Sequence, residues 1–467
     1  MPGDAAGGLP AGGPPRLPPL RHGGRCGTTH GVMNRKAIAW ATFDWANSAF
    51  PTVVSTFVIA AYFAQGIAPD PATGQAQWGW MQTISALAIA VLSPLLGAIA
   101  DRGGHRRALL AACTFCTAVF TGLTWFAEPD PSWTLWALVC VGLATVAFEL
   151  GTVFYNAMLP EVTTPEHMGR LSGLAWGLGY AGGLACLGIA LVVLVQPDPP
   201  PFGLDRDMAE HVRATALLVA AWTVVFAWPV LMAVPDPPGK RIPMREAVTA
   251  CVAETRFLLR GLPRRPDMLR FLIARLFYTD GLNTLFAFGA IYAAGVHGMT
   301  FEEILLFGIA LNVTAGLGAA SFGLLEDRLG SKRTVMVALL AMIVFGAALL
   351  VTGSKAWFWV LAMALGIFMG PAQAASRTLM ARMAPEGEMT AHFGLFALSG
   401  RITGFCGPAV LAAVTAATGS QRAGMATVLF FLGAGAAILA TVRPVRCEAT
   451  LRPIAAGRAE APERDPA

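Results

Sequence analysis

The sequence predicts an all-α polytopic membrane protein, with twelve transmembrane helices in two pseudo-symmetric six-helix bundles. Three observations support this fold class. The chain of 467 residues is 55% hydrophobic and only 13% charged, whereas soluble domains carry about 25% charged residues. Apolar runs long enough to cross a bilayer, which takes roughly 20 residues, recur along the chain. A charged loop motif that follows the second run returns in the second half.

The candidate membrane spans are twelve apolar runs. They cover residues 38–65, 78–100, 107–127, 133–157, 171–195, 212–234, 268–294, 302–323, 334–353, 356–380, 391–417 and 421–442. We therefore predict an N-terminal bundle over residues 35–234, a cytoplasmic link over 235–266 and a C-terminal bundle over 267–442. Prolines end the sixth run. The basic, partly amphipathic segment after them predicts a helix lying on the anionic inner leaflet.

The two ends of the chain have the composition of disordered segments. Residues 1–34 are rich in Pro and Gly and contain no apolar core of a signal peptide, which indicates a disordered cytoplasmic tail. A start at Met33 is the alternative, and it would make the preceding residues an artefact of gene assignment. Residues 443–467 are also predicted to be a disordered cytoplasmic tail.

Positive charges indicate the orientation. Arg and Lys concentrate before the first run, after the second and eighth runs, in the central link and after the last run, whereas the alternate connections carry few. By the positive-inside rule, both termini and the link are cytoplasmic. An even number of spans is required for this arrangement, and twelve satisfies it.

The loop motif is an internal repeat. The segment GAIADRGGHRR, which begins at Gly97, recurs as GLLEDRLGSKR from Gly323, and the offset is 323 − 97 = 226 residues. The glycines permit close helix approach. Asp101 and Asp327 can pair with arginines or cap a facing helix N-terminus, which would make a conformational latch. The predicted latch residues are Gly97, Asp101, Arg102, Arg106, Gly323, Asp327, Arg328 and Lys332.

The alternative interpretation is that these are ordinary positive-inside loop charges. It accounts for most of the pattern at Arg106, Arg107, Lys332 and Arg333, but not for the repeated Asp-Arg and Gly positions. Glu326 replaces the small residue Ala100 in the second copy, so we expect its pairing to differ.

A second repeat places polar residues inside the membrane. Asp44, Asn47 and Ser48 lie at i, i+3 and i+4, on one helical face of the first span. The pattern returns as Asp280, Asn283 and Thr284, at an offset of 280 − 44 = 236. An Asp at membrane depth costs about 2.5–3.5 kcal/mol, so it normally faces a protein-lined or watery interior. We expect both triplets to face a central cavity.

Further polar residues lie on spans four, five, seven, ten and eleven. The candidates for solute binding or coupling beyond the triplets are Glu149, Tyr155, Asn156, Tyr180, Gln373, Arg377 and Arg401. Two alternatives stay open: Arg275 and Arg377 could extend to the interface, and Asp280 and Arg401 could form structural ion pairs.

The types of charged residue inside the spans indicate the coupling ion and the class of solute. A carboxylate shielded from water is a candidate proton carrier, and Asp44, Asp280 and Glu149 are the options. An arginine facing a cavity suits a carboxylate or phosphate. Together these groups favour a solute with both charges, such as an amino acid.

Several segments carry a family resemblance. They are DWANSAF from Asp44, FYNAMLP from Phe154, GLAWGLGYAGG from Gly173, YTDG from Tyr278, Gln373 with Ser376 and Arg377, and HFGLF followed by Gly407-Pro408. With them the chain resembles the major facilitator superfamily, whose plan includes repeats of six spans. Within it, the chain is most similar to the branch of the autophagy-related vacuolar amino-acid effluxer and its bacterial relatives. His392 and Glu149 depart from the pattern expected there.

The resemblance implies export of small solutes. We predict a secondary active transporter that moves a small polar solute by alternating access and proton coupling, in the bacterial cell (inner) membrane that a GC-rich composition indicates. The alternative is a non-transporting sensor or scaffold with the same fold, which has no reason to retain the buried charges. No catalytic or metal-ligand spacing and no nucleotide-binding loop occurs. We therefore expect no enzyme activity, cofactor, metal or nucleic-acid partner, and a monomer whose partners are the lipid bilayer, the solute and protons.

Overall fold

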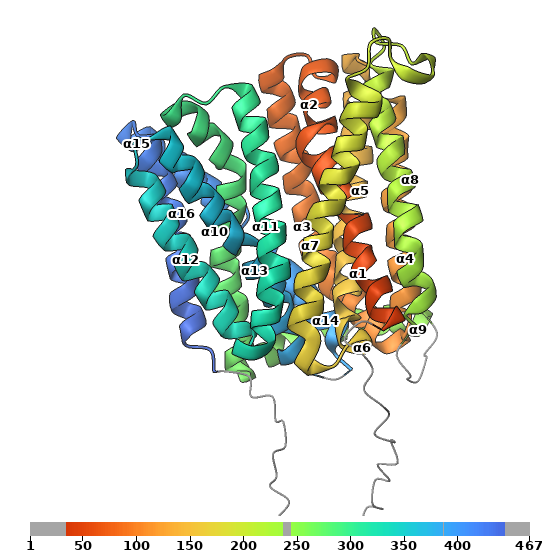
Figure 1. Cartoon of the computed structure of the whole chain (residues 1–467). Helices are drawn as coiled ribbons and strands as arrows, with labels where there is room; N and C mark the ends of the chain where they lie inside the picture. Colours follow the sequence, from red (N-terminus) through yellow and green to blue (C-terminus); the bar gives the residue numbers. More distant parts are fainter. Residues whose placement is uncertain (1–33, 237–243, 386, 444–467) are drawn as a thin grey trace, which may run out of the picture.

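The computed structural model describes residues 34–236, 244–385 and 387–443, and the predicted tails therefore lie almost entirely outside the described residues. Long helices stand side by side in two groups (Figure 1). The first group, which we call the N-half, consists of α1 (Arg35–Asn47), α2 (Ile59–Tyr62), α3 (Pro71–Gly103), α4 (Arg106–Leu123), α5 (Thr134–Ala157), α6 (Leu159–Val162), α7 (Met168–Ile189) and α8 (Glu210–Ala233).

The second group, the C-half, follows the link helix α9 (Met244–Gly261). It consists of α10 (Pro266–His297), α11 (Phe301–Leu329), α12 (Ser331–Val351), α13 (Lys355–Met383), α14 (Met389–Arg401), α15 (Cys406–Thr418) and α16 (Gln421–Ala440). In the described part of the chain, eleven helical runs are long and apolar enough to span a membrane. The remaining long helix is α10, whose polar residues around Asp280 lower its hydropathy. The chain is a multi-pass membrane protein with the predicted all-helical fold.

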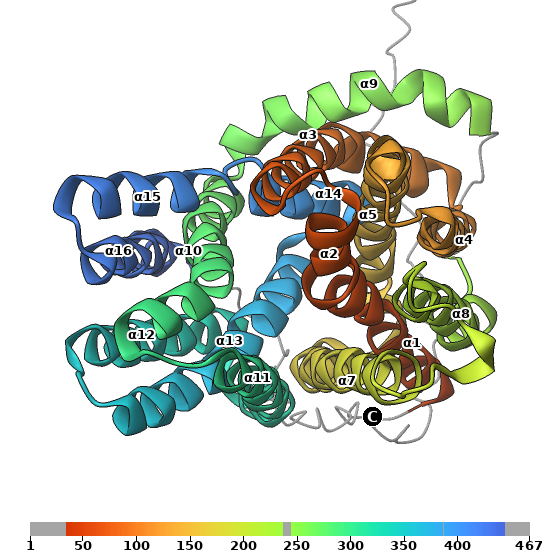
Figure 2. The ribbon, with the colours of Figure 1, turned by 90° about the horizontal axis from the view of Figure 1, so that it is seen from above.

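Spans one and eleven are interrupted along their length. The first span continues from α1 through a π-helical segment, η1 (Phe50–Phe57), then α2 and a second π-helical segment, η2 (Phe63–Ile67). Pro51 lies in the first turn of η1, and its ring removes one backbone donor. The eleventh span breaks between α14 and α15. Figure 2 shows α15 on the outer rim beside α16, while α14 lies near α3.

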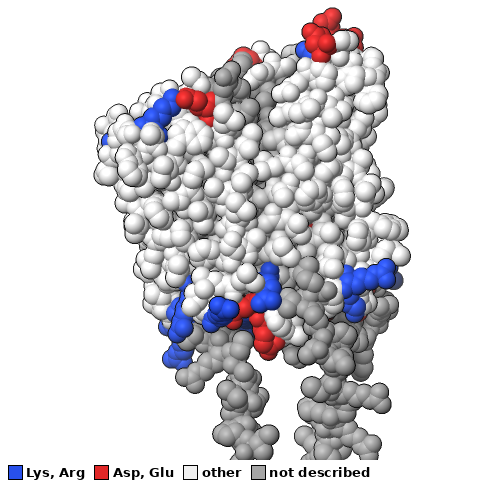
Figure 3. All heavy atoms as spheres, viewed as in Figure 1, with Lys and Arg blue, Asp and Glu red and all other residues white. Residues whose placement is uncertain are grey.

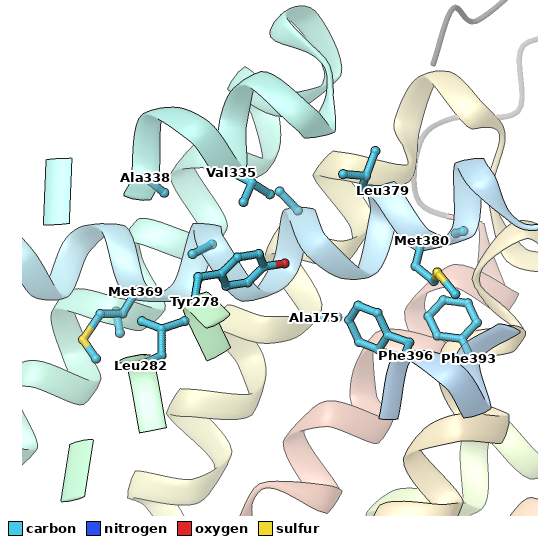
Figure 4. Close-up of a cluster of buried hydrophobic side chains, with 14 of the residues drawn as sticks. Ala175, Tyr278, Leu282, Val335, Ala338, Met369, Leu379, Met380, Phe393 and Phe396 are labelled. Atoms are coloured by element: carbon cyan, nitrogen blue, oxygen red, sulfur yellow. The ribbon is translucent and has the colours of Figure 1, made fainter. Parts of the chain in front are cut away.

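The core of the C-half shows how polar groups are accommodated among apolar helices. Tyr278 of α10 is buried among Leu282, Met369 and Ala338 (Figure 4). Its hydroxyl shares a hydrogen bond of 2.6 Å with the Ser376 hydroxyl of α13. Since a buried hydroxyl without a partner is costly, this bond fixes how the two helices are turned toward each other.

Positive charge gathers at one end of the molecule, which we call the basic end. It contains the start of α1, the α3–α4 and α11–α12 connections and the end of α16 (Figure 3). The link helix α9 packs along α3, where the Thr255 hydroxyl donates to the Pro94 carbonyl at 3.4 Å. Val252 and Phe257 of α9 remain exposed, as an amphipathic helix on a membrane surface requires.

Candidate solute pathway

A cavity of about 870 Å³ lies between and within the two halves, in the part of the molecule away from the basic end. The first span begins at the basic end, and its lining residues run from Ser48 to Gln65. Helix α13 begins at the opposite end, and its lining residues stop at Met369. The cavity therefore occupies the distal half of the helices only.

The two walls of the cavity differ in chemistry. The N-half wall carries hydroxyl and amide groups along the first span, at Ser48, Thr52, Thr56 and Gln65. The C-half wall is mostly apolar and extends between the helices to α12. Its side chains include Met342, Leu349, Phe358, Leu365, Met369, Met425, Val428 and Leu432. None of the described residues that line the cavity carries a charge.

Aromatic side chains of α7 lie at the floor of the cavity. Trp176 and Tyr180 have ring centroids 6.1 Å apart, and both line the cavity. The Gln373 side chain of α13 lies within hydrogen-bonding reach of the Tyr180 hydroxyl. The Arg377 guanidinium lies 5.7 Å from the Trp176 ring, although Arg377 is not part of the lining. The floor thus separates the cavity from a charged layer closer to the basic end.

The charged layer is centred on Arg377, which is only 3% exposed. Its Nη1 donates to Asp44 Oδ2 at 3.0 Å and to Asn156 Oδ1 at 3.4 Å. Its Nε and Nη2 donate to the hydroxyl and carbonyl oxygens of Ser172 at 2.9 and 2.8 Å. The guanidinium also lies 4.8 Å from the Trp40 ring, a cation–π distance. The interpretation that Arg377 extends to the interface is therefore wrong: it joins the C-half to the N-half.

A second pair crosses between the halves. Arg401, the last residue of α14, donates to Glu149 on α5. In both pairs the carboxylate comes from the N-half and the arginine from the C-half. The structural ion pair that the sequence left open for Arg401 is present, with Glu149 as the partner, whereas the pairing of Asp44 with Arg377 was not anticipated.

Asp280 has a different environment from the one we expected. It is 2% exposed and does not line the cavity. Its Oδ2 accepts from the Gly407 amide at 2.9 Å, at the start of α15, and its Oδ1 has no partner among the described residues. Asn283 is exposed outside the cavity, and the Thr284 hydroxyl donates to the Asp280 carbonyl. The expectation that both triplets face the cavity is wrong; only Ser48 lines it.

The remaining candidates support the charged layer or the helix packing. Asn47 donates to the Thr152 hydroxyl at 3.3 Å within the N-half. Tyr155 is fully buried and stacks on Trp40 at 4.5 Å, next to Arg377. Arg275 donates to the Phe396 carbonyl and the Ser399 hydroxyl within the C-half, so its extension to the interface is also wrong. Sequence reasoning missed Ser172, because a single Ser in an apolar helix gives no signal of an arginine partner.

At the basic end, Asp101 joins the α3–α4 loop to the C-half. Its two oxygens accept from the amides of Thr390 and Ala391, at 3.0 and 2.8 Å, in the first turn of α14. Arg106 donates to Asp101 at 2.7 Å and also to Glu161 of α6. Because a helix N-terminus carries a partial positive charge, a carboxylate is favoured there.

Asp327 makes the corresponding contact in the opposite direction. Its Oδ1 accepts from the Arg170 amide at 3.2 Å, near the N-terminus of α7 in the N-half, and the Arg170 side chain lies 3.6 Å away. The rest of the second loop differs from the first. Glu326 accepts from the Ser331 hydroxyl, and Lys332 donates to the Ala440 and Val442 carbonyls near the end of α16. Arg102 and Arg328 are exposed.

Glycines let the two halves touch along the backbone at this end. A Cβ on Gly97 would lie 2.7 Å from the Thr390 carbonyl oxygen, and one on Gly323 would lie 2.8 Å from that of Gly169. On α7, a Cβ on Gly173 would lie 2.3 Å from the Ala319 carbonyl oxygen. Side chains at these positions would force the helices apart. The contacts therefore close the basic end while the cavity occupies the other.

Comparison with known proteins agrees with this architecture. The family model described as "Vacuole effluxer Atg22 like" matches residues 78–449, a range that begins after the Asp44 motif. A Bacillus subtilis protein described as the uncharacterized MFS-type transporter YxiO is 25% identical over 412 residues, which cover 86% of this chain and 94% of the relative. Autophagy-related protein 22 of Cryptococcus neoformans is 24% identical over 283 residues, 56% of this chain and 50% of the fungal protein.

Solved structures show the same fold. The proton:xylose symporter XylE superposes with a TM-score of 0.69 at 12% identity, covering 88% of this chain and 96% of that one. The transporter FucP in its outward conformation gives a TM-score of 0.69 at 14% identity, with coverage of 88% and 100%. At such identities the likeness concerns the fold alone. By its fold and by the match over most of its length, the chain belongs to the Atg22-like branch of the major facilitator superfamily.

Proposed function

We propose that the protein is a secondary active transporter that carries a small solute out of the bacterial cell by alternating access, coupled to protons. The observation that carries this proposal is the pairing of a distal cavity with a basic end closed by contacts between the halves. A transporter of this kind needs one open side, one closed side and closing contacts that can be broken. Because one chain encloses the cavity, we propose a monomer as the working unit.

Orientation follows from the charges at the basic end. By the positive-inside rule this end is cytoplasmic, which makes the described conformation outward-facing. Asp101, Asp327 and the glycine contacts then form the cytoplasmic latch. The word "effluxer" in the family description supports transport outward. The amino-acid substrate that the sequence favoured depended on an arginine facing the cavity. Arg377 and Arg401 are both paired with carboxylates, so the solute class has to be argued from the cavity wall.

Asp280 is the carboxylate best placed to carry a proton. Of the three candidates, Asp44 and Glu149 each have an arginine partner in this conformation. Asp280 has no cation within ion-pair distance in the described part of the chain, and its Oδ1 has no hydrogen-bond partner. The charged groups nearest in sequence do not neutralise it, since Arg275 donates to Phe396 and Ser399. A buried carboxylate without a counter-ion takes up a proton readily.

Transport by purified protein in liposomes tests the function. We expect an imposed pH gradient to drive accumulation of a solute, with proton movement reported by a pH-sensitive dye inside the vesicles. Protein with Gly173→Leu, in which α7 and α11 cannot close, is the matched inactive control, and Gly188→Leu, where a Cβ would meet nothing within 4 Å, is the neutral one. Absence of both solute flux and proton flux across a broad solute panel would contradict the proposal.

A further inference from the structure

The walls of the cavity define a class of solute. We propose that the cavity binds an uncharged amphipathic molecule, whose apolar group enters the side chamber of the C-half and whose neutral polar group faces the hydroxyl and amide side chains. This inference rests on the proposed transport function and deepens it. It differs from the amino-acid expectation because it excludes solutes with a formal charge.

The side chamber is the first part of the argument. Besides α10, α11 and α13, its walls come from α12 and α16, so the cavity reaches into the interior of the C-half. Met342, Leu365 and Leu432 line it and are at most 4% exposed. An aromatic or branched aliphatic group of the solute would leave water on entering this chamber and would make dispersion contacts with the methionines. A volume of about 870 Å³ lies within the range of small-molecule sites.

The polar groups of the lining are the second part. Tyr292 of α10 lines the cavity and is 4% exposed, and its hydroxyl has no hydrogen-bond partner among the described residues. Asn312 of α11 and Gln65 offer further neutral donors and acceptors. Hydroxyls and amides recognise alcohols, amides and carbonyl groups without providing a counter-charge.

The position of the charges is the third part. The ion pair nearest the floor, Asp44 with Arg377, lies behind Ser48 and Trp176, and its members neutralise each other. A carboxylate or ammonium group placed in the cavity would lose hydration and find no counter-ion among the described lining residues. Charged solutes should therefore bind far more weakly than neutral solutes with the same apolar group.

A matched series of probes tests this inference by equilibrium binding to the full chain in lipid nanodiscs, where detergent cannot compete. The probes are 4-phenylbutanamide, 4-phenylbutanoate and 4-phenylbutylamine, which share one apolar group and differ in charge, together with phenylalanine and with butanamide, which lacks the ring. We expect the phenyl amide to bind at least about tenfold more tightly than any other probe, a difference of about 1.4 kcal/mol.

The second part of the experiment fills a portion of the cavity with a larger side chain. Gly289 lines the cavity, and a Cβ there would meet nothing within 4 Å, so Gly289→Leu should reduce binding of the phenyl amide at least about tenfold without disturbing the helices. Gly433→Leu on α16 is the matched control, because Gly433 has equal space but does not line the cavity. Equal or tighter binding of phenylalanine or a charged probe, or full binding by Gly289→Leu, would overturn the inference.

The outcomes separate this inference from the transport proposal. If the phenyl amide binds as expected but no solute moves across liposomes, the transport function fails while the assignment of the cavity stands. If liposomes transport a charged solute and the amide does not bind, the function stands and the solute class is wrong.

Discussion

Asp44 and Asp280 occupy equivalent positions in the two repeats, but they make different contacts. Asp44 reaches across to the other half and pairs with Arg377. Asp280 stays within its own half, where it accepts from the Gly407 amide at the break between α14 and α15. A repeated sequence pattern therefore does not imply a repeated site. In the proposed alternating access, a contact across the halves must change, whereas a contact within one half can persist.

The largest effect is expected from removing the cation of the cross-half pair. Arg377→Met should leave Asp44 partly buried without a counter-ion, at a cost of about 3–5 kcal/mol. We expect a lower yield of folded protein and a lower unfolding temperature, measured by fluorescence-detected size-exclusion chromatography. The double variant Asp44→Asn, Arg377→Met should recover much of the loss. Arg333→Met, at an exposed position, is the control; equal loss in that variant would contradict the comparison.

Asp280→Asn should have a selective effect. Its carboxamide oxygen can still accept from the Gly407 amide, so we expect normal abundance and normal solute exchange without a gradient. Accumulation driven by a pH gradient should be lost, because Asn cannot take up a proton. The measurement is solute counterflow beside proton-driven uptake in the same liposomes. Undiminished driven uptake would move the proton site to Asp44 or Glu149.

The two aspartates of the proposed latch should differ in the strength of their contacts. Asp101 accepts two helix amides and pairs with Arg106, whereas Asp327 accepts one amide at a longer distance. Since hydrogen bonds to charged groups contribute about 1.5–3 kcal/mol each, Asp101→Asn should reduce flux more than Asp327→Asn at equal membrane abundance. Solute uptake normalised to surface protein measures this. An equal or reversed order would show that the latch depends on the glycine contacts instead.

The smallest effect concerns Glu161, which supports Arg106 within the N-half. Burial raises the pKa of Glu161 to about 7, and Arg106 opposes this rise. A pKa that is higher in the folded state gives stability that is fully present below about 4.5 and is lost as the pH rises through about 7. We expect the unfolding temperature to fall between pH 5 and pH 8, and to fall less in Glu161→Gln. An unchanged slope in that variant would assign the pH dependence to other groups.

Much of the fold followed from the sequence, because apolar runs and loop charges are local signals. The Asp101 and Asp327 repeat also indicated which loops touch a facing helix. What the sequence could not give were the partners of those carboxylates, since the amides of Thr390 and Ala391 belong to the backbone and leave no side-chain signature. The lining of the side chamber was equally hidden: Met342 and Leu432 look like ordinary core residues until the helices around them are placed.

The breaks in spans one and eleven were also unpredictable. Pro51 gives a local reason for the irregular first span. At the break after Arg401, the Gly407 amide donates to Asp280, which is more than a hundred residues away in the sequence and comes close only in the folded protein. Asp280, which we expected in the cavity wall, thus accepts a hydrogen bond at a helix end instead.

The direction of the two cross-half ion pairs has a consequence for assembly. Both carboxylates, Asp44 and Glu149, belong to the first bundle, and both arginines, Arg377 and Arg401, belong to the second. Two copies of the first bundle would bring acid against acid, and two copies of the second would bring base against base. The placement of these charges therefore favours packing of the first bundle against the second over packing of two identical bundles.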